Sequence, residues 1–150
     1  MASRREQLLA ALFEALGKVE GVELIERNRT HQIDQSVNSA LVLMDGNVEG
    51  ETDPKDWDRE PVFRLELTPE VMGCVRAPDA EAGTLRDELL SRAVAAVWTD
   101  RDLRRLVADY DGYVAIDGID SMLAVKAASK ASAVFVIGLR IGFVFDPANP

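Results

Sequence analysis

The chain has 150 residues, 47% of them hydrophobic and 29% charged, with a formal net charge of −9 and one cysteine. This length supports one domain whose core needs neither disulfides nor metal. The acidic balance argues against a conventional nucleic-acid binder, which carries a basic stripe, although it is compatible with a protein that only lets nucleic acid pass. The lone Cys74 excludes an internal disulfide, and no run of about 20 apolar residues suits a membrane helix. With no signal-peptide pattern at the N-terminus, we expect a protein of the cytosol or of a particle assembled there.

Three helices are predicted. The first covers residues 3–16, where apolar residues recur at three- and four-residue spacing and Ser3 with Glu6 has the form of a capping box. A long helix is predicted over residues 79–98 and a short one over 101–108. Because Gly83 and Thr84 weaken the first turns of the long helix, Thr84 is an alternative start.

Strand patterns fill most of the remaining chain. They are predicted over residues 22–26, 40–44, 61–68 with 71–76 as a candidate continuation, 113–119 and 122–125. The run 40–44 is apolar throughout, which is typical of a strand buried on both faces. Gly118 breaks the pattern after residue 117, and residues 127–132 form a small-residue loop.

The best-determined element is the last strand, Ala133 to Phe145. Its odd-numbered positions are large and apolar, whereas its even-numbered positions are small or branched and include Arg140. At ~3.3 Å per residue the strand would reach about 40 Å, so we expect a bend or bulge at Gly138 or Gly142. The odd face should pack under the helices. The even face is a candidate subunit contact, with Glu66 as a candidate partner for Arg140.

The order of these elements predicts the fold class. A helix, several strands, two helices and more strands follow one another, so the elements are segregated rather than alternating. We therefore predict one α+β domain over residues 1–150, with a mixed or mostly antiparallel sheet packed against the N-terminal helix, the long central helix and the short helix.

Two polar loops are predicted. Residues 28–36 include Arg29 and the only histidine, His31, which we interpret as an exposed loop residue. Residues 45–60 form a long acidic loop, a length that is uncommon unless the loop is functional or disordered. It lacks the spacing of a calcium loop. The loop is either a solvated excursion or a projecting contact loop with Trp57 as its aromatic anchor.

No constellation of catalytic residues is present in the sequence. Glycine-rich phosphate loops, a nucleophile elbow and zinc-spaced cysteines are all missing. The apolar neighbours of Cys74 favour an inert thiol. We therefore predict no catalytic, cofactor-binding or metal-binding residues and no enzyme; a metal-dependent hydrolase using the acidic loop is the weakest alternative.

The layout resembles the tail terminator, or tail completion, proteins of long-tailed bacteriophages and gene-transfer particles. The resemblance rests on the opening helix R-R-E-Q-L-L-A-A-L-F-E-A-L, the strand L-V-L-M-D-G before an acidic loop, and the alternating strand P-V-F-R-L-E-L. It continues through the helix L-R-D-E-L-L-S-R-A-V-A-A-V-W, the segment T-D-R-D-L-R-R-L and the closing L-R-I-G-F-V-F-D-P. The end departs from the tyrosine-arginine ending of such proteins.

This resemblance implies a structural virion protein at the head-proximal end of the tail, assembled in the host bacterial cytoplasm. Six copies would form a ring that caps the tail tube, stops its polymerisation and joins the head connector. The partners would be the chain itself, the tail tube protein and the head–tail connector protein, and DNA would pass through the lumen without specific binding. The candidate subunit or tube contacts are Arg29, His31, Asp45, Glu49, Glu51, Asp53, Trp57, Arg64, Glu66 and Arg140. The alternative is a monomeric acidic protein-binding adaptor that uses Trp57 and its loop.

Overall fold

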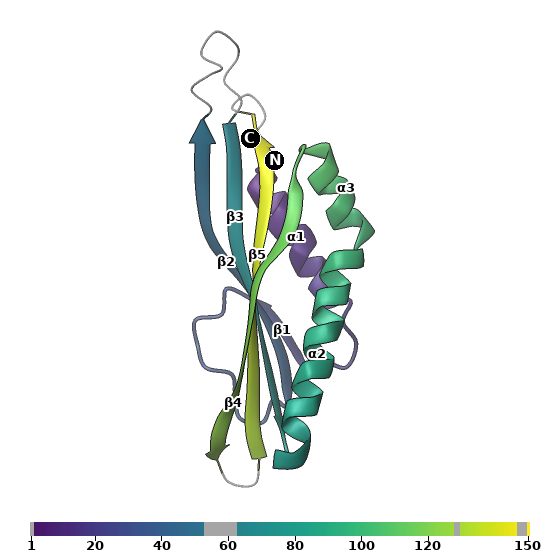
Figure 1. Cartoon of the computed structure of the whole chain (residues 1–150), viewed down its shortest axis with the longest axis vertical. Coiled ribbons are helices and arrows are strands. Elements are labelled where there is room, and N and C mark those ends of the chain that lie inside the picture. The colour runs from purple at the N-terminus through teal and green to yellow at the C-terminus, as the bar shows by residue number, and fades with distance from the viewer. Residues whose placement is uncertain (1, 53–62, 128–129, 147–149) are drawn as a thin grey trace.

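The computed structural model describes residues 2–52, 63–127, 130–146 and 150. These residues form an α+β domain with one sheet, as predicted (Figure 1). Its elements are α1 (Arg4–Gly17), β1 (Leu24–Arg27), β2 (Ser39–Thr52), β3 (Phe63–Ala77), α2 (Asp79–Thr99), α3 (Arg101–Asp109), β4 (Tyr113–Ala127) and β5 (Lys130–Phe145).

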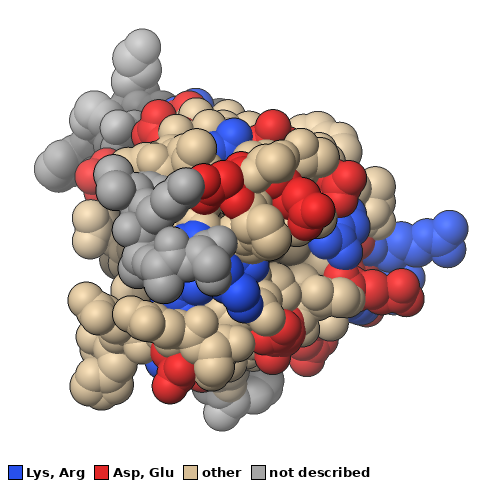
Figure 2. Space-filling view, turned by 90° about the horizontal axis from the view of Figure 1, so that it is seen from below, with Lys and Arg blue, Asp and Glu red and all other residues tan. Residues whose placement is uncertain are grey.

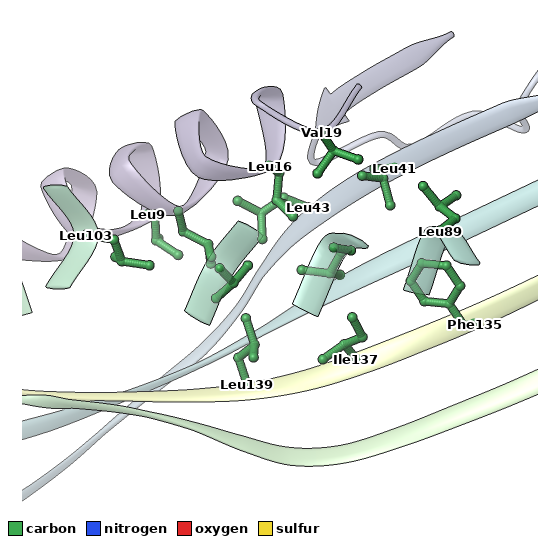
Figure 3. Packing of buried hydrophobic residues seen from close by; sticks show 14 of the residues in the cluster. Leu9, Leu16, Val19, Leu41, Leu43, Leu89, Leu103, Phe135, Ile137 and Leu139 are labelled. Atoms are coloured by element: carbon green, nitrogen blue, oxygen red, sulfur yellow. The ribbon is translucent and has the colours of Figure 1, made fainter. Parts of the chain in front are cut away.

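The sheet is mixed, with strand order β1-β2-β3-β5-β4. Only β1 and β2 run parallel, and the other neighbours are antiparallel. The helices lie on one face, which we call the helix face (Figures 1 and 3). Over one end of the opposite, open face lies the polar loop that precedes β2. The guanidinium of Arg76 on β3 fixes this loop by donating to the carbonyls of Ile33, Asp34 and Val37.

The core lies between the helices and the helix face of the sheet (Figure 3). Odd-numbered residues of β5 point into it, and Phe135, Ile137 and Leu139 are each at most 2% exposed. The predicted two faces of β5 are thus confirmed, because the even-numbered residues are mostly only half-buried. Helix α1 adds four leucines to the same core: Leu8, Leu9, Leu12 and Leu16. Burial of these large side chains is the main force that holds the layers together.

Of the bend or bulge predicted at Gly138 or Gly142, the bulge is wrong for β5, because the extra residues are in its neighbours. Strand β5 keeps one register along β3, while β4 shifts between Ile116 and Gly118, opposite Gly138. Strand β2 shifts in the same way between Met44 and Asn47. Strand β4 is at the edge of the sheet, and β1 pairs with β2 only as far as Leu43, so both shifts lie where the strand has a hydrogen-bond ladder on one side. Such a place accommodates an irregularity more easily than a strand with ladders on both sides. Strand β4 therefore continues through Gly118 instead of breaking there.

Strand β3 runs through Pro69 because the β2 bulge lies beside it. Proline has no N–H to donate to a ladder, and the register skips this residue on both sides. Gly46 in the bulge has φ +68°, and a Cβ there would lie 1.9 Å from the Thr68 carbonyl oxygen. Residues 45–52 are consequently a strand, not the start of the predicted loop.

The helix boundaries follow their caps. Ser3 Oγ accepts a 3.2 Å hydrogen bond from the Glu6 amide, as the capping pattern predicted. Helix α2 begins at Asp79 after Pro78, so the alternative start at Thr84 is wrong. The small-residue loop predicted over residues 127–132 is mostly strand, and its residues 128–129 lie outside the described part. Among the described residues, no helix has both the length and the apolar character needed to cross a membrane.

Candidate subunit-contact surfaces

Arg29 and His31 lie in the predicted loop after β1. The Arg29 guanidinium pairs with the Glu26 carboxylate at 2.5 Å and donates to the carbonyls of His31 and Gln32 at 2.9 Å each. These bonds fold the loop back on its own strand. The side chain of His31 is exposed, as predicted.

Asp45 belongs to an ion-pair network within the chain. Both of its carboxylate oxygens accept from Arg27, at 2.7 and 2.9 Å, and Arg27 also forms a bidentate pair with Glu6 of α1. The hydrogen bonds from Arg27 lower the pKa of Asp45 and of Glu6 below their ordinary values. The network therefore ties α1, β1 and β2 together, and it leaves little of Asp45 free for a partner.

Arg140 pairs with Asp117, not with Glu66. Its Nε lies 3.2 Å from Oδ1 of Asp117, the residue at the β4 bulge. Glu66 instead accepts a 2.5 Å hydrogen bond from the hydroxyl of Tyr113. That bond raises the pKa of Tyr113, because the neighbouring carboxylate disfavours a phenolate. The even face of β5 is thus occupied by an internal ion pair at Arg140.

Three of the predicted contacts meet in one place. Glu49 on β2 lies directly opposite Glu66 on β3, and Arg64 lies two residues before Glu66. They line a hollow of about 210 Å³, which we call the acidic hollow, and Asp111 brings a third carboxylate. Its remaining lining residues are Leu65, Tyr113, Gly142 and Phe143.

The other predicted contacts are not placed. The side chain of Glu51, together with Asp53, Trp57 and the rest of the acidic loop, lies outside the described residues. Cys74 is half-buried on β3, and burial raises the pKa of its thiol above the ordinary value. That direction agrees with the expected inert thiol, because the thiolate is the reactive form.

The exposed apolar edge of β4 was not predicted from the sequence. Strand β4 is the last in the sheet order, so one side of its backbone has no neighbouring strand. Four of its large apolar side chains are 37 to 61% exposed, and we call them the apolar edge: Ile116, Ile119, Met122 and Leu123. These apolar residues alternate with Asp117, Asp120 and Ser121 along the strand. Apolar residues on both sides of polar ones were the signal in the sequence that could have predicted an exposed apolar strand.

A second surface that was not predicted lies at the junction of α2 and α3. Trp98 is 48% exposed, and the Arg104 guanidinium lies 4.8 Å from the centre of its ring. Arg101 and Arg105 are exposed on the same helix. We call these four residues the arginine corner. Trp98 and Ile116 line a common apolar pocket, so the arginine corner continues into the apolar edge.

The described residues contain no group of three or more His, Cys, Asp or Glu side chains that could hold a metal ion. On the face shown in Figure 2, acidic and basic residues are interspersed, with no basic stripe of the kind that binds nucleic acid. A scan against protein-family models finds no match, and a search of curated proteins finds no relative. The functional interpretation therefore depends on these surfaces and on the sequence resemblance.

Proposed function

We propose that this chain is a structural protein of a phage-like tail, a tail terminator whose copies form a ring at the head-proximal end of the tail tube. The ring stops tube polymerisation and offers its other face to the head connector. Its mechanism is geometric, because heterologous contacts between identical subunits close a ring. The tail terminator is proposed because the order of elements in the sequence resembles that of tail terminator proteins.

The observation that supports assembly is the apolar edge of β4. Natural proteins protect edge strands because unpaired backbone groups and apolar side chains invite another chain. Here Ile119, Met122 and Leu123 are each about half exposed on such an edge. Ile119 and Leu123 lie on the helix face, as their β5 partners Ile137 and Ala133 do, and Met122 lies on the open face, so they flank the edge on both sides. Exposed apolar side chains along an open strand edge favour a partner chain. Because each of these side chains is already about half buried, a partner that covers it would gain roughly half of the ~1.5–3 kcal/mol that burying a fully exposed side chain contributes.

The test is the state of assembly of the purified chain. Light scattering and negative-stain images should show rings, or monomers that gather at one end of purified tail tubes. Ile119→Lys on the apolar edge should prevent either form of assembly. Monomers both alone and with tubes, and bare tube ends, would overturn the proposal and favour the monomeric adaptor.

Leu85→Lys is the matched control for this experiment. Leu85 is also an exposed apolar residue, at 38% against 47% for Ile119. It lies seven residues before Arg92, which donates to the Glu20 carbonyl just after α1. Residues seven apart share a helix face, so Leu85 points toward the α1 side of α2, away from β4. Assembly should survive this substitution.

A further inference from the structure

The polar face of α3 is unusually basic for so acidic a chain. Leu103 and Val107 point into the core, whereas Arg101, Arg104 and Arg105 share the opposite face at three- and four-residue spacing. The acidic residues Asp102 and Asp109 are seven positions apart and lie together on the flank of this face. Neither Arg101 nor Arg105 has an ion-pair partner among the described residues.

The composition of the arginine corner is that of a protein-binding hot spot. Tryptophan and arginine are the residue types most enriched where binding energy concentrates. Trp98 supplies a half-exposed ring, and Arg104 holds it by stacking and by donating to the Trp98 carbonyl. A ring that is ordered before binding loses less conformational entropy on binding. The corner thus requires an acidic partner surface with apolar or aromatic character.

The acidic hollow on the open face has that character. Glu49 and Glu66 are directly opposite in the β2–β3 ladder, an arrangement that is unfavourable for two like charges. Asp111 adds a third carboxylate and Arg64 the only cation of the lining, while Tyr113 contributes an aromatic ring. Glu49 is exposed and has no ion-pair partner among the described residues. A guanidinium from outside would relieve this repulsion.

We infer that the arginine corner of one copy docks on the acidic hollow of the next copy. The inference rests on the proposed ring, and it names the two surfaces that close it. Arg64 and Glu66 of the hollow are even-numbered residues of β3, on the face opposite the buried odd-numbered residues. Helix α3 packs on the helix face (Figure 1), so one chain cannot join its own two surfaces. Two different patches make the contact heterologous, as a ring requires. Arg101 and Arg105 supply the positive charges. Trp98 covers the apolar and aromatic residues that line the hollow, which are Leu65, Tyr113 and Phe143.

Reciprocal charge reversal tests the inference. One variant carries Arg101→Glu and Arg105→Glu, and the other carries Glu49→Arg and Glu66→Arg. Each alone brings like charges together and should assemble at least tenfold more weakly than the parent chain, alone or on tail tubes. An equimolar mixture should recover assembly, because each variant then meets the opposite charge on both sides. A mass tag on one variant, read by native mass spectrometry, should show the two in equal numbers in each assembly.

Two controls separate this contact from a general effect of charge and from misfolding. Arg86→Glu with Lys130→Glu, on α2 and at the start of β5, makes the same change in net charge as Arg101→Glu with Arg105→Glu, and it should leave assembly unchanged. Circular dichroism and urea unfolding should show that both reversed variants are folded, since Glu49, Arg101 and Arg105 are exposed and Glu66 is partly exposed. Parent assembly should also weaken as salt is raised from 0.1 to 1 M, where the screening length falls from about 10 to 3 Å.

The outcomes distinguish this inference from the proposed function. Undiminished assembly of either reversed variant, or a mixture of folded variants that stays unassembled, would overturn the contact and leave the ring itself standing. A closed two-fold dimer through the apolar edge would overturn both the contact and the ring, because such an interface is isologous and ends at two copies. A parent chain that never assembles, with or without tubes, would overturn both.

Discussion

Gly73 shows how closely single residues are packed under the helices. A Cβ on this β3 glycine would lie 2.0 Å from Cζ of Phe135, whose ring is 1% exposed and has no room to move. Gly73→Ala should therefore lower the free energy of unfolding by roughly 1–3 kcal/mol, measured by urea denaturation. Gly83→Ala is the control, because nothing lies within 4 Å of that Cβ in α2. It should stabilise the protein by about 0.5–1 kcal/mol; equal effects of the two substitutions would contradict the packing.

Asp45 should make stability depend on pH. Its pKa is lowered in the folded state by Arg27, so its contribution is present above the ordinary carboxyl pKa of about 3.9 and is lost as pH falls through the lower folded value. Asp45→Asn should cost about 1–2 kcal/mol of unfolding free energy at pH 7. The difference from the parent chain should therefore be smaller at pH 3 than at pH 7 and should go on shrinking at lower pH.

Urea unfolding at pH 7 and pH 3 measures this dependence. Glu88→Gln, at an exposed position of α2, should change stability little at either pH. A difference between the parent and Asp45→Asn that is as large at pH 3 as at pH 7 would show that packing, not charge, is what the substitution removes.

At the scale of elements, α3 depends on one buried carboxylate. Asp100 is 6% exposed, caps α3 by accepting from the Leu103 amide at 2.8 Å, and pairs with Lys18 at 2.7 Å. Burial opposes ionisation, yet the hydrogen bond from Lys18 holds the pKa of Asp100 below its ordinary value. Asp100→Ala should destabilise the protein by about 2–3 kcal/mol, because it removes the cap and leaves the Leu103 amide unsatisfied.

Lys18→Gln separates the two roles of Asp100. It keeps the cap and removes only the ion pair, whose lysine is mostly exposed, so it should cost less than about 1 kcal/mol. Thermal unfolding of both variants, with the ellipticity at 222 nm followed, measures the difference. An equal loss for Lys18→Gln and Asp100→Ala would show that the ion pair, and not the cap, fixes α3.

The elements that could be predicted from sequence are those whose pattern is set by burial. The odd face of β5 and the heptad-like stripes of the helices both face one core, and both were found. Residues 45–52 were missed because they form the outer part of a strand, and residues 46–50 are exposed there, where charged and glycine residues are tolerated. Burial leaves no signal there, and the hydrogen-bonded register with β3 is what makes the segment a strand.

At the scale of the whole molecule, most of the candidate site depends on pairing between distant residues. Glu49 and Glu66 were named separately, but only the β2–β3 register brings them opposite each other. The partner of Arg140 depends on the bulge that presents Asp117, a shift that no local pattern encodes. The exposure of β4 follows from its place at the end of the strand order. Sequence periodicity predicts which face of a helix or strand is buried, whereas these features depend on which strands pair with one another and in what register.

The place of β5 has a consequence for how the chain folds. It is the last of the five strands to leave the ribosome, yet it lies between β3 and β4. Until it is synthesised, β4 has no strand to pair with, and β3 exposes one full edge. Pairing residues 63–77 with residues 131–145 closes a long loop, and closing a long loop slows the folding of the sheet. Between the synthesis of β4 and that of β5, the nascent chain therefore presents an unpaired β4 and one open edge of β3, and this interval is when it most needs a chaperone.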